Sequence, residues 1–234
     1  NVKTKYKRLI RKDVGTFGFC RVFNASSKLV SPSSRGMLEY RPTTSKEVEK
    51  ILKKMKKSRS SGVDGISSEM IKPVIKELSP AITEVINSSL REGIFPEAFK
   101  LAKIVCIYKK KGEKSDKNNY RPVSNLAIIG KCIEVVVDIQ LRMYCEKFGL
   151  LGAHQHGFRR LRSTSTALLT AVSQWRSQKA AKKFQGVLMF DLSAAYDLVD
   201  REVFLAKANI YGIKGIALAW LLFRASSQNG IGKR

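Results

Sequence analysis

The chain has 234 residues, of which 44% are hydrophobic and 27% charged, and its 44 Lys and Arg against 19 Asp and Glu give a formal net charge of +25. This composition is typical of a globular protein and excludes a largely disordered one. The charge excess indicates a polyanionic partner, nucleic acid before an anionic membrane surface, because solubility alone requires far less.

The positive charge is uneven along the chain. Residues 1–60 contain 17 basic and 4 acidic residues, and residues 121–190 contain 11 and 3. No apolar run of membrane-spanning length and no signal peptide is visible, so we expect neither a membrane location nor secretion. Without a CxxC pair or zinc-ligand spacing, the cysteines indicate reduced thiols in an intracellular protein, nuclear or cytoplasmic. They are Cys20, Cys106, Cys132 and Cys145.

The first half of the chain predicts a basic arm followed by helices. Residues 1–42 are basic and lack periodicity, so we expect an irregular arm. Thr44 and Glu47 form a capping-box pattern that begins a helix, which ends in the basic loop "KKMKKSRSSGVDG". A second helical segment starts near Ser67. A third begins at Ser79 and ends near Gly93.

The middle of the chain predicts a hairpin. The β-rich stretches at 102–108 and 121–126 flank the polar, basic segment "KKKGEKSDKNN", which indicates a long hairpin with a cationic tip. A helix of roughly 130–148 follows and is stopped by Gly149.

The last third predicts further helices and one strand. A helix of about 163–178 is expected to place Leu168, Val172 and Trp175 on a core-facing side. The apolar run 186–191 is expected to form a buried strand, and helical patterns follow at 201–210 and 214–224. Helices with few strands indicate an α/β or α+β fold.

The strand at 186–191 ends on a charged residue. "VLMF" runs directly into Asp191, with Asp197 and Asp200 close behind. Asp191 either caps a following helix or stands at the end of a sheet to hold a positive group. The local sequence leaves the two interpretations equal. Asp200 is a candidate cap for the 201–210 helix, and neither it nor Asp197 is expected to bind a metal ion.

Five stretches, in this order, resemble the reverse transcriptases of non-long-terminal-repeat retrotransposons, the LINE-like or jockey-like elements. They are "SRSSGVDGISSEMIK" (58–72), "FPEAFKLAKIVCIYKKKG" (95–112), "NNYRPVSNLAIIGKCIE" (118–134), "LLGAHQHGFRRLRSTSTAL" (150–168) and "VLMFDLSAAYDLVD" (187–200). The resemblance implies a partial chain with a right-hand polymerase fold. Residues 43–185 would form the fingers and residues 186–234 the start of the palm, truncated before the catalytic hairpin.

The resemblance also implies an activity, that of an RNA-directed DNA polymerase using an RNA template, a DNA primer and deoxynucleotide triphosphates. It places Asp191 and the carbonyl of Leu192 as ligands of Mg²⁺, in a site where two metal ions stabilise the attacking and leaving oxygens. Tyr196 would lie beneath the sugar of the incoming nucleotide and select deoxynucleotides. Simple packing of its ring against the palm is the alternative.

Further roles follow for two basic segments. Arg121 would hold the triphosphate through its planar guanidinium, helped by Lys109, unless the lysines of this hairpin are only a solvated loop. By the same resemblance, one segment contacts the template strand or shapes the nucleotide pocket. Its members are Gln155, Gly157, Phe158 and Arg159. The alternative is a loop that packs on the core, because its sequence would have the same pattern.

The sequence departs from the family pattern near its end. The Pro-Gln-Gly segment and the hairpin with two adjacent aspartates are not found up to Arg234. We therefore expect these 234 residues to be inactive alone as a polymerase. The alternative function is that of a non-catalytic, basic nucleic-acid-binding remnant of a decayed retroelement.

Overall fold

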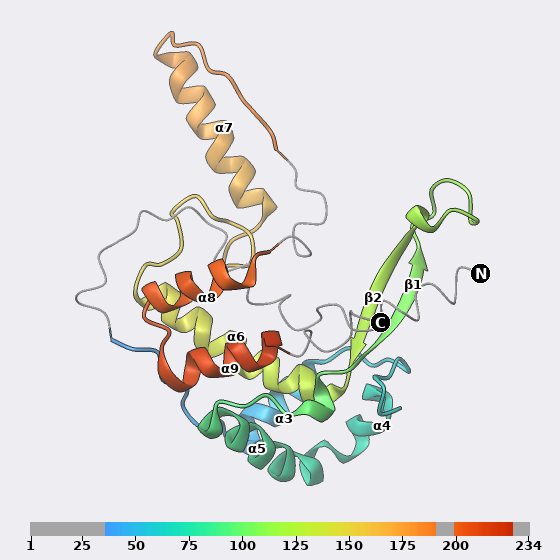
Figure 1. The fold of residues 1–234 in the computed structure, drawn as a ribbon. Coiled ribbons are helices and arrows are strands. Elements are labelled where there is room, and N and C mark those ends of the chain that lie inside the picture. Colours follow the sequence, from blue (N-terminus) through green and yellow to red (C-terminus); the bar gives the residue numbers. More distant parts are fainter. Residues whose placement is uncertain (1–35, 191–198, 227–234) are drawn as a thin grey trace.

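A computed structural model describes residues 36–190 and 199–226 of the chain (Figure 1). The described helices are α3 (Ser45–Lys54), α4 (Ser68–Ile71), α5 (Ile75–Glu92), α6 (Ile128–Lys147), α7 (Thr164–Ala180), α8 (Arg201–Ile210) and α9 (Gly215–Ser226). Two strands, β1 (Ala102–Tyr108) and β2 (Tyr120–Leu126), form an antiparallel hairpin. Short 3₁₀ turns lie at η2 (Lys72–Val74), η3 (Glu97–Phe99) and η4 (Lys117–Asn119).

Two helix starts agree with the sequence. Thr44 Oγ1 accepts a hydrogen bond of 3.3 Å from Glu47 N, and Glu47 Oε2 accepts one of 3.0 Å from Thr44 N, which confirms the capping box at the start of α3. Asp200 Oδ1 accepts from the backbone nitrogens of Glu202 and Val203, at 2.9 and 3.1 Å. Asp200 is therefore the N-cap of α8, as its position before the helix suggested.

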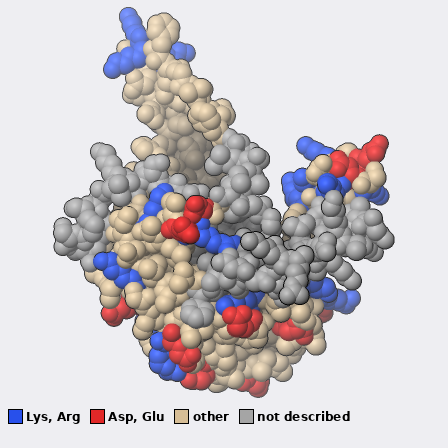
Figure 2. Space-filling view, viewed as in Figure 1, with Lys and Arg blue, Asp and Glu red and all other residues tan. Residues whose placement is uncertain are grey.

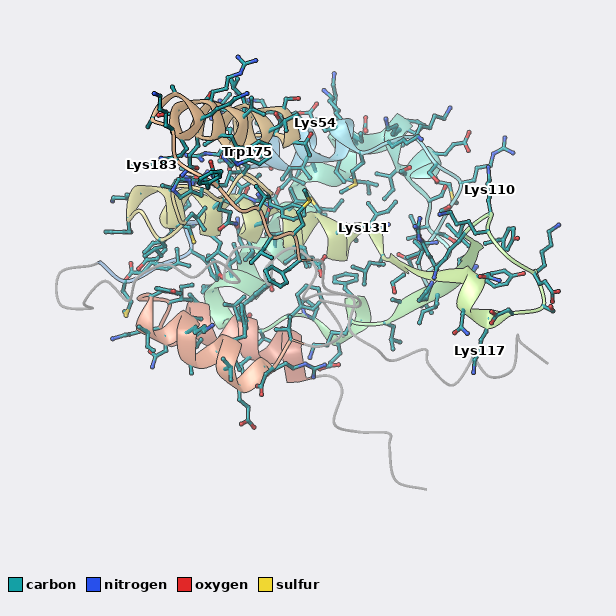
Figure 3. All side chains as sticks on the ribbon, turned by 90° about the horizontal axis from the view of Figure 1, so that it is seen from above. Lys54, Lys110, Lys117, Lys131, Trp175 and Lys183 are labelled. Atoms are coloured by element: carbon teal, nitrogen blue, oxygen red, sulfur yellow. The ribbon has the colours of Figure 1, made fainter. Side chains whose placement is uncertain are left out.

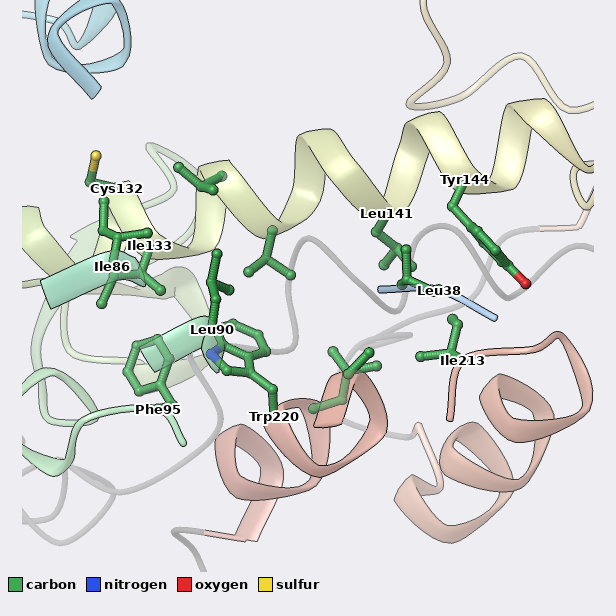
Figure 4. Packing of buried hydrophobic residues seen from close by; sticks show 14 of the residues in the cluster. Leu38, Ile86, Leu90, Phe95, Cys132, Ile133, Leu141, Tyr144, Ile213 and Trp220 are labelled. Carbon is green, nitrogen blue, oxygen red and sulfur yellow. The ribbon is translucent and has the colours of Figure 1, made fainter. Parts of the chain in front are cut away.

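The hydrophobic core lies between α3, α5, α6, α8 and α9 (Figure 4). Trp220 of α9 is fully buried in it and meets the ring of Phe95 edge to face, with centroids 5.5 Å apart. Ile86 of α5 and Leu141 of α6 are also fully buried. Each such side chain contributes roughly 1.5–3 kcal/mol by leaving water. The C-terminal helices α8 and α9 thus belong to the same core as the helices of the first half of the chain.

The β1–β2 hairpin projects from this body (Figure 1). Ala102 pairs with Leu126 at its root, where both are buried, and Tyr108 pairs with Tyr120 at its far end. The described residues contain no third strand, so the outer edge of each strand has no strand partner among them. The predicted hairpin with a basic tip is confirmed.

Helix α7 also projects from the body, and none of its side chains is buried (Figure 1). Leu168 is 61% exposed and Trp175 is 37% exposed. The expectation that Leu168, Val172 and Trp175 face the core is therefore wrong. The reason is that no other described element packs closely against this helix, so its apolar residues have no surface on which to be buried.

The segment 186–190 differs from the prediction as well. It has no regular secondary structure, and Leu188, Met189 and Phe190 are each more than 80% exposed. The expectation of a buried strand is wrong for these residues. A strand requires backbone partners, and within 36–190 and 199–226 the two strands pair only with each other. The described part of the chain is thus a helical body with one small sheet, a mixed α and β architecture.

No helix in the described ranges is both long enough and apolar enough to cross a bilayer.

Candidate nucleotide and nucleic-acid interface

Arg121 lies one residue pair from the far end of the exposed ribbon, directly opposite Ile107. Side chains alternate along a strand, so Arg121 shares one ribbon face with Val105 and Val123, both of which are exposed. Its guanidinium makes no hydrogen bond or ion pair with another described residue. An arginine on a partly apolar surface, without a partner among the described residues, can donate two parallel hydrogen bonds to a phosphate.

Lys109 lies at the tip of the same hairpin, and its ammonium already makes one hydrogen bond within the tip. Lys109 Nζ donates a hydrogen bond of 2.7 Å to the carbonyl oxygen of Asn118, and its backbone nitrogen donates to that of Asn119, also at 2.7 Å. The exposed Lys110, Lys111, Lys114 and Lys117 surround it. Figure 3 shows Lys110 and Lys117 at this end of the ribbon, and Figure 2 shows acidic side chains among the basic ones there. The tip is therefore organised but not purely cationic.

The segment 155–159 is tied to the end of α6 by Arg159. Its Nε and Nη2 donate to the two carboxylate oxygens of Glu146, at 2.9 and 2.6 Å, and its Nη1 donates to the carbonyl of Gly152 at 3.0 Å. These hydrogen bonds from Arg159 hold the pKa of the Glu146 carboxyl below its usual range. The Arg159 guanidinium therefore fixes the loop in place.

The neighbours of Arg159 are more open. Phe158 is about half exposed and has a φ of 60°, in the left-handed region that side chains rarely adopt. Its carbonyl accepts a hydrogen bond from Arg142 of α6. Gln155 Nε2 lies 3.5 Å from the carbonyl oxygen of Gly157, and nothing within 4 Å would meet a side chain at Gly157. An aromatic ring beside open space is suited to stacking on a base.

The two sets of candidate residues lie at opposite ends of α6 (Figure 1). Arg121 precedes the start of α6 by a few residues, and the 155–159 loop follows its end. Twenty residues of helix span about 30 Å. The structure therefore does not bring the hairpin and the loop into one site.

The expected metal ligands and the residue expected to contact the sugar are not among the described residues. Asp191, Leu192 and Tyr196 lie outside the described residues. Within 36–190 and 199–226, no group of three or more His, Cys, Asp or Glu side chains is arranged to hold a metal ion.

One hollow was not expected from the sequence. A cavity of about 580 Å³ lies at the root of the hairpin, between the end of α3, the 56–68 loop and α6. Lys56 and Lys131 both line it. Sequence reasoning missed it because its walls come from two segments, 55–68 and 125–138, and the only signal was the basic character of the first.

Comparison with known proteins relates the chain to polymerases. Residues 108–233 match the family described as reverse transcriptase (RNA-dependent DNA polymerase). The RNA-directed DNA polymerase from mobile element jockey of Drosophila funebris is 28% identical over 167 residues, which are 71% of this chain and 18% of the relative. The probable RNA-directed DNA polymerase from transposon X-element of Drosophila melanogaster is 28% identical over 153 residues, 65% of this chain and 17% of the relative. The chain spans less than a fifth of the length of either.

Proposed function

Because the chain belongs to the reverse transcriptase (RNA-dependent DNA polymerase) family, we propose that it forms the fingers and the first part of the palm of an RNA-directed DNA polymerase from a non-long-terminal-repeat retrotransposon. The fingers comprise residues 43–185 and the palm begins at residue 186, with the basic arm 1–42 before them. The substrates are an RNA template, a DNA primer and deoxynucleotide triphosphates. Similarity to jockey and X-element polymerases supports this assignment.

The observation that carries the proposal is the guanidinium of Arg121, which makes no hydrogen bond or ion pair with another described residue and lies on an exposed ribbon within the matched part of the chain. Arg121 binds the triphosphate of the incoming nucleotide bidentately, and the adjacent apolar side chains exclude water from one side of that contact. Lys109 contributes a second positive charge from the tip. Since its ammonium keeps the carbonyl of Asn118 as a partner, it acts as a fixed charge rather than as a freely moving one.

The catalytic role falls on residues outside the described ranges. Asp191 offers a carboxylate oxygen and Leu192 a carbonyl oxygen, and hard oxygen donors suit Mg²⁺. When bound, the metal ions stabilise negative charge on the attacking and leaving oxygens of nucleotidyl transfer. Tyr196 lies under the sugar and excludes a 2′-hydroxyl.

The template strand is assigned to the loop at the far end of α6. Phe158 offers its ring for stacking, and Gly157 allows the strand to approach the backbone closely. Arg159 holds the loop in place through its ion pair with Glu146, and Gln155 belongs to the same loop. The length of α6 between this loop and the hairpin, about 30 Å, fits an extended nucleic acid better than a small ligand.

The test uses a longer polymerase that contains this segment. Arg121→Ala should raise the KM for deoxynucleotide triphosphate or lower kcat by at least about tenfold, because one charge-assisted bidentate contact is lost. Template binding should change little, since it is distributed over many cations. The matched control is Arg91→Ala, an exposed arginine of α5 that pairs only weakly with Glu84, at 3.8 Å. Unchanged kcat and KM in Arg121→Ala would remove Arg121 from the nucleotide site.

A second candidate function is nucleic-acid binding without catalysis, which the net charge of +25 favours. Asp191→Ala in the longer protein separates the two. If the protein is a polymerase, the substitution abolishes primer extension on an RNA template and leaves template binding intact. If neither the original nor the variant extends a primer while both bind RNA, the non-catalytic function is the correct one.

A further inference from the structure

We propose that a second cavity, between residues 37–42, α5 and the start of α9, binds a small monocarboxylate with an apolar body. Its volume of about 580 Å³ lies within the range of small-ligand sites. Its lining residues lie outside both the hairpin and the 155–159 loop, so the cavity is separate from the nucleotide and template contacts proposed above. The proposal does not rest on the proposed function.

The walls of this cavity are joined to one another before any ligand arrives. Asn87 of α5 binds both backbone groups of Thr43, since its Oδ1 accepts from Thr43 N at 2.8 Å and its Nδ2 donates to the carbonyl oxygen at 3.1 Å. Leu38 N donates a hydrogen bond of 3.1 Å to the carbonyl oxygen of Gly212, shortly before α9. A site held in this way loses little conformational entropy on binding.

Most of the lining is apolar. Leu38 and Leu90 belong both to the hydrophobic core and to the wall of the cavity (Figure 4). The ring of Tyr40 meets that of Trp220 edge to face, with centroids 6.2 Å apart. The other apolar lining residues are Met37, Pro42, Ile216 and Ala217. Such a wall favours a ligand with a hydrocarbon or aromatic body, because burying apolar surface is what it can contribute to binding.

The hydroxyl of Tyr40 is a donor without an acceptor. Tyr40 lines the cavity, and its hydroxyl oxygen is buried with no hydrogen-bond partner among the described residues, which is rare for a buried polar group. Burial raises the pKa of this hydroxyl above its usual range, so it keeps its proton and can donate it. The neighbouring amide of Asn87 is already bound at both ends by Thr43. An acceptor atom on a ligand would satisfy Tyr40.

The start of α9 supplies further donors. Gly215, Ile216 and Ala217 are its first three residues, and all line the cavity. The backbone nitrogens of the first turn of a helix have no acceptor within the helix. Leu218 N donates to the carbonyl oxygen of Lys214 at 3.3 Å, which makes Lys214 the N-cap, and a lysine side chain has no acceptor for these donors. A carboxylate would complete this helix start, where the helix dipole also favours negative charge.

The charges around the cavity fit an anion with a single charge. Arg91 and Glu84 lie 3.8 Å apart at its edge and largely offset each other. Lys214 is exposed and forms no ion pair with another described residue, and Glu39 is exposed to water as well. A dianion such as phosphate would meet one uncompensated lysine and the repulsion of two nearby acids. A monocarboxylate matches the one lysine and brings the acceptor oxygens that Tyr40 and α9 lack.

The test measures binding of three small molecules to the isotope-labelled 234-residue chain by chemical-shift titration. Phenylbutyrate has a carboxylate on an apolar body, phenylbutanol has the same body without the charge, and acetate has the charge without the body. Phenylbutyrate should shift the amide signals of Gly215 and Ile216 and bind with a Kd of about 1 mM or below. Phenylbutanol and acetate should each bind at least about tenfold more weakly, because each lacks one half of the contacts.

A lysine pair tests the charge. Lys214→Met removes the positive charge and keeps the length of the side chain, so it should weaken phenylbutyrate binding about tenfold and leave phenylbutanol binding unchanged. The matched control is Lys207→Met, which removes the same charge from an exposed position of α8 outside the cavity and should not weaken binding. Both positions are exposed, so the fold tolerates both substitutions.

Tyr40→Phe tests the hydroxyl by a second property. It should weaken phenylbutyrate binding at least about threefold, through loss of one hydrogen bond to a charged group. Without ligand it should not lower the free energy of unfolding, because the hydroxyl has no partner to lose among the described residues. A hydroxyl that serves only the fold would give the opposite pair of results.

Three outcomes would overturn the proposal. They are no binding of phenylbutyrate at about ten times the expected Kd, equal affinities for phenylbutyrate and phenylbutanol, and equal losses in Lys214→Met and Lys207→Met. The last would assign the binding to the overall charge of +25 rather than to the cavity. None of these measurements involves a nucleotide or a nucleic acid, so their failure is distinct from a failure of the proposed function.

Discussion

The indole nitrogen Nε1 of Trp220 donates a hydrogen bond of 3.0 Å to Ser89 Oγ and thereby joins α9 to α5 across 131 residues of chain. Ser89 Oγ in turn donates to the carbonyl oxygen of Ile94 at 2.6 Å. Both Trp220 and Ser89 are buried, so water cannot replace either partner. This contact makes the C-terminal helix part of the fold of the first half of the chain.

Replacing Ser89 should therefore destabilise the whole protein. Ser89→Ala leaves the Trp220 nitrogen buried without its acceptor, which costs about 1–3 kcal/mol of the free energy of unfolding. Urea titration measures the change. The control is Ser88→Ala, whose hydroxyl bonds to Glu92 at an exposed site and whose loss should cost less than about 0.5 kcal/mol. Equal effects of the two substitutions would show that the Trp220 contact is not important for stability.

The capping box of α3 predicts a dependence of stability on pH. The hydrogen bond from Arg41, followed by that from the backbone of Thr44, lowers the pKa of Glu47 from 4.5 to about 2. A carboxyl whose pKa is lowered on folding stabilises the protein above its unfolded pKa, and this contribution is lost as the pH falls from 4.5 towards 2. Glu47→Ala should cost about 1 kcal/mol at neutral pH.

Acidification should make the cost of Glu47→Ala smaller, because the original carboxyl then becomes protonated too. Unfolding of both proteins in urea, at a series of pH values between neutral and strongly acidic, measures the difference. Glu84→Ala, on an exposed position of α5, serves as the control and should show no such trend. A cost that stays constant across the range would mean that Glu47 is not held in its charged form by these contacts.

The thiols should differ sharply in reactivity. Burial raises the pKa of Cys132 and of Cys145 to about 12 each, whereas Cys106 lies partly exposed on β1. Only thiolates react readily with iodoacetamide, so among the three described cysteines Cys106 should be alkylated first at about pH 8. Peptide mass spectrometry identifies the modified residues. In concentrated urea Cys106, Cys132 and Cys145 should react at similar rates, and early labelling of Cys132 in the folded protein would contradict its burial.

Binding to nucleic acid should be strongly dependent on salt and nearly independent of sequence. With a net charge of +25, the chain releases counterions from each phosphate it contacts. Affinity for RNA or DNA should fall by at least about tenfold between roughly 50 and 200 mM salt. Fluorescence anisotropy with two unrelated sequences measures both properties. A flat salt dependence would exclude this mode of binding.

Local patterns in the sequence predicted local structure well. The spacing of Thr44 and Glu47 gave the start of α3, because a capping box involves only four consecutive residues. The hairpin followed from two β-rich runs around a polar, Gly-containing segment, and the register confirms that they pair along their whole length. These features depend on neighbours in the chain, which a sequence displays directly.

Long-range packing could not be predicted in the same way. The apolar residues of α7 and of 186–190 have the spacing of buried elements, yet burial requires a partner surface that no periodicity reveals. The structural role of Arg159 is a further feature that the sequence did not predict. Its ion pair with Glu146 joins a loop to the end of α6 and depends on how the chain turns at Gly149 and Gly152. The roles of Asp191, Leu192 and Tyr196 stay predictions.

Helix α7 has a practical consequence for handling the protein. Its basic residues Arg176 and Lys179, and Lys182 and Lys183 just beyond, are exposed, whereas the side chain of Lys100 is only 4% exposed. Among the described residues, trypsin should therefore cut readily within α7 and the segment just beyond it, where local opening requires no disruption of the core. A cut there would break the covalent connection between α8 and α9 and the rest of the chain. Since Trp220 holds α9 in the core through Ser89, the two fragments should remain together until a denaturant is added.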